Sequence, residues 1–194
     1  APAAGFGPDA VTLLPLPLYS NLTLSYLFSA LGTGGTAVLM ARFDAADYLA
    51  LAEPHRATHT VPVPVQFRRL LDHPRFETTD LSRLTRQLSA GAPFAAELKR
   101  EVLARWPGEL IEFYGMTEGG GRTELRARQH PDKLHTVGQP LPGHDLRTID
   151  DEGRELPRGQ VGEVVGRSNS MMNGYRNQPE KTEAAQWISP EGEV

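Results

Sequence analysis

The sequence predicts an α/β protein, with a parallel sheet flanked by helices and then a smaller β-rich region. In residues 1–121, short apolar runs alternate with segments of helical length, the order typical of a parallel sheet with helices on its faces. After Gly121 the sequence changes to short apolar runs separated by Pro-Gly and Asp-Glu-Gly turns, which favours β structure. We therefore expect two subdomains, residues 1–121 and 122–194, with ligands at the carboxyl ends of the parallel strands.

The first elements lie in a stretch without charge. No side chain in residues 10–41 is charged, as in a membrane-spanning segment. Two prolines near its start and three glycines near its end interrupt it and leave an apolar helix of about ten residues, which is too short to cross a bilayer. The stretch therefore predicts a buried strand at residues 12–14, a helix, and a second buried strand at residues 36–40.

Start and stop signals delimit the next elements. One helix is expected to begin at Asp44, whose negative charge suits the positive end of the helix dipole, and to end before Pro54. A longer helix is expected to have Pro93 in its first turn and Gly108 just after its last turn. The expected elements are a helix at residues 44–53, a strand at 58–63, a helix at 66–71, a strand at 83–89, a helix at 93–106 and a strand at 110–114.

In the β-rich region, short runs around Val137 and at residues 146–149 and 161–165 predict strands. The chain has no initiator Met, and it stops after Pro190 at a turn with only the beginning of a further strand. A lone hairpin arm leaves backbone groups unpaired. We therefore expect this region to be truncated at its C-terminal end.

Composition excludes several classes of partner and site. The net charge of −4, without a clustered basic face, gives no electrostatic footprint for nucleic acid. The absence of cysteine excludes disulfides, iron–sulfur clusters and thiolate zinc sites. No basic region opens the chain as in a signal peptide, so we expect a cytoplasmic protein without a transmembrane segment that binds small molecules.

Residues 112–118, Glu-Phe-Tyr-Gly-Met-Thr-Glu, have the chemistry of a nucleotide site at the end of a strand. The ring of Tyr114 can stack on a base, and Gly115 lets the backbone approach a ligand closely. Thr117 offers a hydroxyl to a phosphate oxygen, and Glu118 offers the hard carboxylate that magnesium prefers. From this chemistry alone, an ordinary strand-turn with a solvated Glu118 stays open as an alternative.

Tyr114 to Glu118 resembles the Tyr-Gly-x-Thr-Glu signature of the adenylate-forming superfamily, which contains acyl-CoA synthetases, luciferases and peptide-synthetase adenylation domains. Four other segments resemble family segments in the same order, namely residues 14–20, 89–93, 162–163 and 171–182. The resemblance spans nearly the whole chain. It implies an internal piece of the large N-terminal domain, with a Rossmann-like subdomain and then a β-rich one.

The resemblance implies an ATP-dependent reaction in two steps. A carboxylic acid attacks the α-phosphate of ATP to give an acyl-adenylate and pyrophosphate, and the thiol of CoA then takes the acyl group. Thr117 and Glu118 are the implied catalytic residues, with Thr117 on phosphate and Glu118 on magnesium. Tyr114 is expected to pack on the adenine and Glu112 to lie beside its amino group. The remaining nucleotide-binding residues implied are Gly91, Ala92, Pro93, Phe113, Gly115 and Met116.

The acid-binding pocket is implied at Tyr19, Ser20, Gly119 and Gly120. Many relatives have His where Ser20 stands, so the shape of the pocket, and with it the acid, is left undefined. The glycines from Gly119 could let the acid pass close to the backbone, although a flexible turn explains them equally well. Gly174 and Tyr175 are expected to be structural, with the tyrosine packing across a turn.

Residues 171–182 look most like those of fatty or aryl acyl-CoA ligases, which favours a CoA ligase over a peptide-synthetase adenylation domain. The family's Lys-Gly phosphate loop, its Thr-Gly-Asp segment and its C-terminal domain with a catalytic lysine are absent from these 194 residues. We therefore expect the chain by itself to be inactive.

The sequence leaves two alternative functions open, each from a different class of protein. Gly32 to Ala37 fits the dinucleotide-binding pattern G-x-G-x-x-A, with Glu53 about 20 residues further on. That fingerprint needs a strand before it and a helix after it, whereas the sequence predicts the reverse. The second rival is a non-catalytic nucleotide-binding or interaction domain that keeps the nucleotide loop without turnover.

Overall fold

The computed structural model describes residues 5–190 and Gly192. The chain divides into two compact units, each made of two segments. Unit 1 comprises Ala1–Phe113 and Leu125–Gly138, and unit 2 comprises Tyr114–Glu124 and Gln139–Val194. Two strands, β5 and β6, run through the boundary, so the chain crosses between the units inside regular structure.

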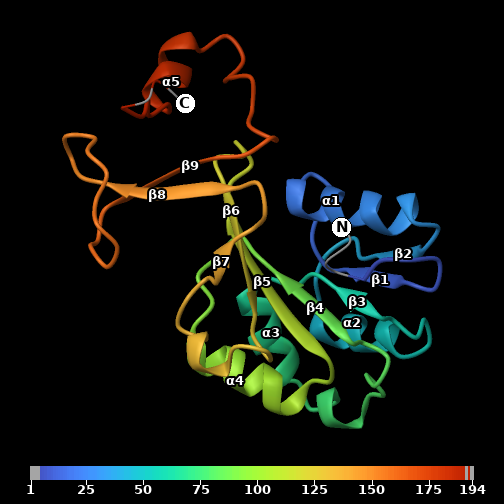
Figure 1. Cartoon of the computed structure of the whole chain (residues 1–194). Coiled ribbons are helices and arrows are strands. Elements are labelled where there is room, and N and C mark those ends of the chain that lie inside the picture. The colour runs from blue at the N-terminus through green and yellow to red at the C-terminus, as the bar shows by residue number, and fades with distance from the viewer. Residues whose placement is uncertain (1–4, 191, 193–194) are drawn as a thin grey trace. The chain divides into compact units, whose positions relative to one another are not determined.

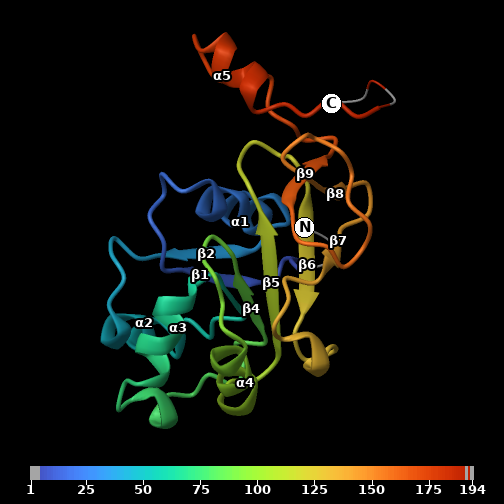
Figure 2. The same cartoon turned by 90° about the vertical axis from the view of Figure 1, so that its left-hand side faces the viewer.

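A largely parallel sheet forms the centre of unit 1, with its strands hydrogen-bonded in the order β2-β1-β3-β4-β5-β6 (Figures 1 and 2). The strands are β1 (Val11–Leu14), β2 (Thr36–Leu39), β3 (His59–Thr60), β4 (Arg86–Ser89), β5 (Glu109–Gly115) and β6 (Arg122–Arg126). The first five run parallel, with Leu13 opposite Thr60 and Ser89 opposite Glu112. Their carboxyl ends therefore share one edge of the sheet, where ligands bind in open α/β folds.

Helices cover both faces of this sheet, as expected for buried parallel strands (Figure 1). They are α1 (Asn21–Gly32), α2 (Ala45–Ala52), α3 (Pro64–Leu71) and α4 (Ala96–Arg105), with 3-10 turns at Phe76–Thr78 and Pro131–Lys133. On one face, Leu14, Val61, Leu88 and Ile111 pack under α1. On the other, α2, α3 and α4 enclose a larger core around the buried indole of Trp106.

The predicted fold class is confirmed, and so is the strand, helix and strand order of the uncharged stretch. In the described part of the chain, no helix is long and apolar enough to span a membrane. Gly32 ends α1 and Thr36 begins β2, so the glycines of the dinucleotide pattern follow a helix and precede a strand. That order is the opposite of the one the dinucleotide fingerprint requires.

Three predicted elements are at least three residues shorter than expected, and one of them is the strand predicted at residues 83–89, which begins only at Arg86. The strand predicted at residues 58–63 is reduced to His59–Thr60, because Pro62 and Pro64 lack the amide hydrogen that a ladder needs. The helix predicted from Pro93 begins at Ala96 instead. Phe94 turns into the core and is 7% exposed, which keeps residues 93–95 outside the helix.

Unit 2 consists mainly of antiparallel strands. Within it, β6 pairs with β7 (Gln139–Pro140), and β8 (Asp145–Ile149) pairs along its whole length with β9 (Glu163–Arg167). The expected run around Val137 forms no strand, and the strand expected at residues 161–165 begins two residues later. Strand β6 and the short helix α5 (Pro179–Ala184) were not predicted.

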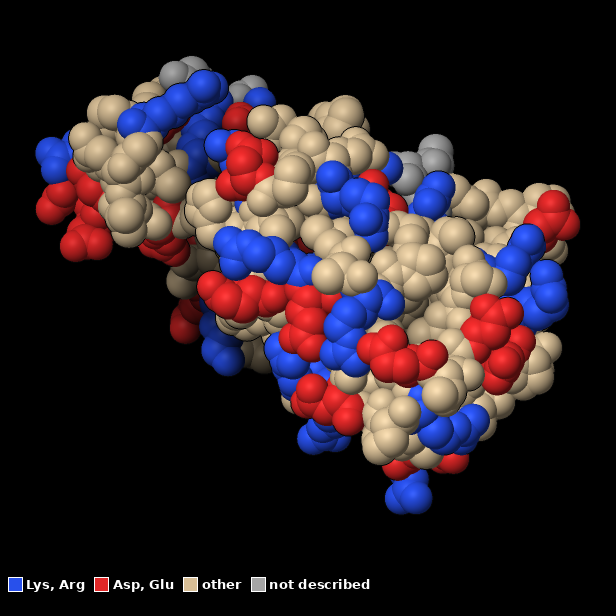
Figure 3. Space-filling model, turned by 90° about the horizontal axis from the view of Figure 1, so that it is seen from below, with Lys and Arg blue, Asp and Glu red and all other residues tan. Residues whose placement is uncertain are grey.

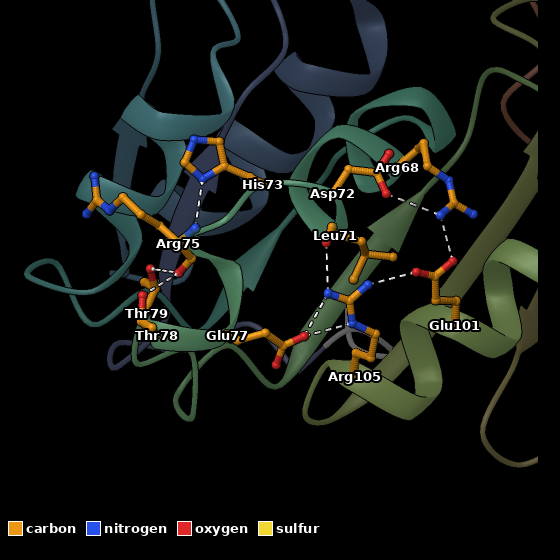
Figure 4. A network of polar contacts seen from close by, with 10 residues as sticks. All are labelled: Arg68, Leu71, Asp72, His73, Arg75, Glu77, Thr78, Thr79, Glu101 and Arg105. Atoms are coloured by element: carbon orange, nitrogen blue, oxygen red, sulfur yellow. Dashed lines mark hydrogen bonds and ion pairs between the residues drawn. The ribbon is translucent and has the colours of Figure 1, made fainter.

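The end of unit 1 at which α4 lies carries charges of both signs. In Figure 3, which views the molecule from below, Lys and Arg alternate with Asp and Glu. Figure 4 shows how part of this surface is connected: Arg105 of α4 points to Glu77, and Arg68 of α3 points to Glu101 of α4. Arg105 contacts Glu77 and Glu101 at 2.7 Å each and donates to the carbonyl of Leu71 at 2.8 Å.

We expect Arg105→Ala to lower the free energy of unfolding by about 1 to 2 kcal/mol, because one guanidinium joins three segments and also covers the Phe76 ring. Urea unfolding of the variant measures the change. Arg100→Ala on the same helix is the matched control, since Arg100 contacts only the exposed Glu97, at 3.6 Å, and should leave stability unchanged. Equal losses in both variants would contradict a special role for Arg105.

Candidate functional site

In unit 1, the carboxyl end of β4 lies beside Glu112 of β5. Ser89 is the last residue of β4 and is paired in register with Glu112 of β5, so the loop that follows Ser89 begins next to Phe113. The buried hydroxyl of Ser89 donates to the carbonyl of Pro62 at 3.0 Å, which fixes the start of this loop.

The residues predicted to line an adenine ring, Gly91, Ala92 and Pro93, are exposed on this loop. Gly91 has a φ of +85°, in the left-handed region that favours glycine, and this makes the turn possible. Phe113 packs near Tyr26 of α1, with ring centroids 6.5 Å apart. Unit 1 therefore brings three predicted adenine-binding residues close to a fourth, Phe113 of β5.

Glu112 faces the interior of unit 1. Its carboxylate is in contact with the ammonium of Lys99, and both side chains are almost fully buried. Burial raises the pKa of the Glu112 carboxyl, and the ion pair with Lys99 opposes that rise. Its predicted place beside the adenine amino group stays a prediction.

Tyr19 and Ser20, predicted to belong to the acid pocket, lie in the segment between β1 and α1. Ser20 is the N-cap residue of α1, without a capping hydrogen bond from its side chain. Tyr19 is 90% exposed. Both therefore lie after the carboxyl end of β1, at the same edge of the sheet as the loop after β4.

In unit 2, the last two residues of β5 and the loop that follows carry the signature residues. Tyr114, Met116 and Thr117 are exposed and can reach a ligand, whereas Glu118 is half-buried. The hydroxyl of Tyr175 donates to Oε1 of Glu118 at 2.9 Å, and this bond raises the pKa of Tyr175. The peptide of Glu118 is also held, because its carbonyl accepts from the amide of Met172 at 2.8 Å.

Close packing of backbone explains the first glycine after the signature. Gly119 has a φ of +84°, and a Cβ there would lie 2.1 Å from the carbonyl oxygen of Ser170. The Gly119 carbonyl accepts from the hydroxyl of Ser168 at 2.7 Å. The loop is therefore fixed against residues 168–172, which is a third explanation for a glycine at this position.

A cavity of about 300 Å³ opens beside Glu118 within unit 2. The side chains of Met116, Tyr175 and Trp187 contribute to its wall, together with those of charged residues such as Arg147. Its lining thus combines apolar surface with a carboxylate and a guanidinium, as in many small-molecule sites.

A family model described as "AMP-binding enzyme" matches residues 1–176. The chain belongs to this family. As an AMP-binding enzyme it is a member of the adenylate-forming acyl-CoA ligases, and the predicted family is confirmed.

Relatives of this AMP-binding enzyme include two kinds of aryl-acid ligase. It is 32% identical to a feruloyl-CoA synthase from Amycolatopsis sp over 176 residues, which are 90% of this chain and 36% of that protein. It is 34% identical to 4-coumarate–CoA ligase 1 from Solanum tuberosum over 191 residues, 95% of this chain and 35% of that one. The chain thus spans about a third of the length of these curated relatives.

Solved structures agree with this family. The amide bond synthetase McbA from Marinactinospora thermotolerans superposes with a TM-score of 0.85 at 35% identity, over 97% of this chain and 38% of McbA. The ATP-bound MatB from Rhodopseudomonas palustris superposes with a TM-score of 0.80 at 29% identity, over 97% of this chain and 37% of MatB.

The residues around Glu118 fit a magnesium ion that is shared with a nucleotide. Among the residues that the structure describes, no group of three or more His, Cys, Asp or Glu side chains converges on one point. Magnesium in nucleotide sites is held by one or two carboxylates, by phosphate oxygens and by water, not by a protein cage. A single carboxylate such as that of Glu118, oriented by Tyr175, meets this requirement.

Sequence reasoning missed two polar residues close to the predicted site. Tyr175 was expected to pack across a turn, and no local pattern points from it to Glu118, 57 residues away. The burial of Lys99 could have been predicted from the sequence. Lys99 precedes Val102 by three residues and Trp106 by seven, and this spacing places all three on the inner face of α4.

If Glu118 holds magnesium as predicted, removing the Tyr175 hydroxyl should weaken magnesium binding, because Glu118 then loses the partner that orients it. For Tyr175→Phe we expect the magnesium concentration at half-maximal activity to rise about three- to tenfold, because Tyr175 acts on the ion only through Glu118 and its loss removes about 0.7 to 1.4 kcal/mol. A magnesium titration of pyrophosphate release measures it. Tyr48→Phe is the matched control, since the Tyr48 side chain is buried in the core of unit 1 and does not belong to the predicted site; an equal shift there would contradict the assignment.

Proposed function

We propose that the protein activates an aryl carboxylic acid with ATP as an acyl-adenylate and transfers the acyl group to the thiol of CoA. The choice of an aromatic acid is the more specific part of this proposal. Relatives named for ferulate and 4-coumarate support an aromatic acid over the fatty acids that the sequence left open.

The observation that carries the proposal is the arrangement of the signature loop. Thr117 is exposed and Glu118 is oriented on the segment that leaves the end of β5, which is where α/β sheets bind nucleotides. The ATP-bound relative MatB has the same fold and supports ATP as the nucleotide.

In the proposed reaction, a carboxylate oxygen of the acid attacks the α-phosphorus of ATP and pyrophosphate leaves. Gly91, Ala92, Pro93 and Phe113 would line the adenine, with Tyr114 stacked on it. Thr117 would donate its hydroxyl to a phosphate oxygen. These contacts hold the reactants in line, and positioning of this kind is the main contribution of a protein to phosphoryl-type transfer.

Glu118 would hold magnesium, which when bound supplies positive charge that neutralises the phosphates. Gly115 and Met116 complete the predicted nucleotide loop. Tyr19, Ser20, Gly119 and Gly120 are proposed to contact the acid. In the second step the sulfur of CoA attacks the acyl carbon, and AMP leaves with the electron pair of the broken C–O bond.

The acceptor could instead be an amine. The relative McbA is named as an amide bond synthetase and is 35% identical to this chain. The first step is the same for both acceptors, since each attacks the carbonyl of an acyl-adenylate. Thiol and amine acceptors are therefore distinguished only by the product.

The decisive experiment measures acid-dependent release of pyrophosphate by the full-length gene product with ATP and magnesium. The panel comprises hydroxycinnamic, benzoic and fatty acids, each with CoA, with an amine, or with neither. We expect turnover with aromatic acids and a thioester product. Amide formation would favour the McbA-like function, and ATP binding without turnover would favour the non-catalytic alternative. The 194 residues alone should release no pyrophosphate, because they lack the Lys-Gly and Thr-Gly-Asp segments.

A further inference from the structure

The ammonium of Lys99 is buried in the core of unit 1 and has four neighbours. It contacts the carboxylate of Glu112 and donates to the carbonyls of Leu134 and Thr136, both at 2.9 Å. The ring of Phe94 lies 5.8 Å from the ammonium, close enough for a cation–π contact. Only 1% of the Lys99 side chain is exposed.

These neighbours adjoin both predicted adenine-binding segments of unit 1. Phe94 directly follows Pro93 and is anchored in the core, where its ring lies 5.3 Å from that of Phe67. Glu112 directly precedes Phe113 in β5. One ammonium therefore fixes the end of the loop after β4 and the last interior residue of β5 relative to each other.

We propose that Lys99, through its ion pair with Glu112, is a positioning residue for ATP: it sets the spacing between the loop of Gly91 to Pro93 and Phe113 of β5. This inference rests on the proposed function, since it concerns the same nucleotide site. Because its side chain is buried, Lys99 acts through Phe94 and Glu112.

A role in stability alone is a poor explanation of the pair. Taking two charges out of water costs more free energy than their attraction returns, unless the geometry is excellent. Replacing both members of such a pair by apolar side chains of similar volume is often neutral or stabilising. The neighbouring core of Val102, Trp106 and Leu110 is apolar and would accept such a replacement. What the apolar pair loses is the directional contact with Leu134, Thr136 and Phe94.

The test uses the double variant Lys99→Met/Glu112→Leu of the full-length gene product. We expect a melting temperature above that of the single variant Lys99→Met, because no unpaired carboxylate is left in the core, although the carbonyls of Leu134 and Thr136 lose their donor. We also expect the KM and Kd for ATP to rise about tenfold, while the KM for the acid stays within about twofold. The matched control is Glu97→Leu/Arg100→Met, which removes the exposed ion pair of the same helix and should leave the ATP constants unchanged.

A second variant, Glu112→Gln, keeps an acceptor oxygen for the ammonium of Lys99 and should keep the KM for ATP within about threefold. If Glu112→Gln raises the KM for ATP tenfold at an unchanged melting temperature, the Glu112 carboxylate contacts the nucleotide directly and the positioning role of Lys99 is wrong. The role is also wrong if the folded double variant binds ATP like the unchanged protein. Failure of the unchanged protein to bind ATP would instead overturn the proposed function itself, and is seen before any variant is compared.

Discussion

Glu118→Ala is expected to lower kcat for ATP-dependent pyrophosphate release by more than a hundredfold. One charge-assisted contact is worth about 1.5 to 3 kcal/mol, which is a factor of ten to a hundred, and Glu118 is the only signature residue with a carboxylate for magnesium. Thr117→Ala removes a single hydroxyl contact to phosphate and should lose about ten- to a hundredfold. The order of the two losses is therefore part of the prediction.

Steady-state pyrophosphate release at several magnesium concentrations checks this expectation. Glu97→Ala serves as the matched control, because Glu97 is exposed on α4 and belongs neither to the signature nor to the lining of the cavity beside Glu118. We expect the control to retain the activity of the unchanged protein. If kcat and the magnesium dependence of Glu118→Ala are unaltered, Glu118 does not bind magnesium and its assignment to the site is wrong.

Most of the sheet in unit 1 could be predicted because its strands are short apolar runs between strong breakers. β1 and β2 were found in this way, and so was β5, which runs into Gly115. β6 was missed because residues 122–126 read Arg-Thr-Glu-Leu-Arg, with charge at three of five positions. Its pairing partners, not its own composition, make it a strand.

The candidate site was predictable only where its residues are contiguous in sequence. Tyr114 to Glu118 are adjacent and carry their chemistry in one loop. The bond from Tyr175 to Glu118 joins residues 57 apart, and the contact of Lys99 with the Leu134 carbonyl joins residues 35 apart. Both depend on how distant segments pack, and no local periodicity contains that information.

The single variant Lys99→Met is expected to lower the free energy of unfolding by about 3 to 5 kcal/mol near neutral pH, the usual loss when one member of a buried ion pair is removed. The carboxylate of Glu112, 4% exposed, is then left in the core without a cation. Urea unfolding followed by tryptophan fluorescence suits this measurement, because Trp106 is buried in the core of unit 1 at the end of the helix that carries Lys99.

The loss should depend on pH with a defined sign. Burial already raises the pKa of Glu112 in the folded protein, and without Lys99 nothing opposes that rise. Between the unfolded pKa of about 4.3 and the raised folded pKa, the native variant binds a proton that the unfolded chain does not, so its stability falls as pH rises. The deficit relative to the unchanged protein should therefore be smallest below the unfolded pKa and reach its full size above the folded one.

Lys99→Met/Glu112→Leu is the control for this prediction, since it has no carboxyl to titrate at position 112 and its stability relative to the unchanged protein should lack this additional pH dependence. A deficit in Lys99→Met that stays constant between about pH 4 and pH 8 would instead attribute the loss to packing of the lysine stem. The unpaired charge of Glu112 would then contribute little, and the apolar double variant should be as unstable as the single one.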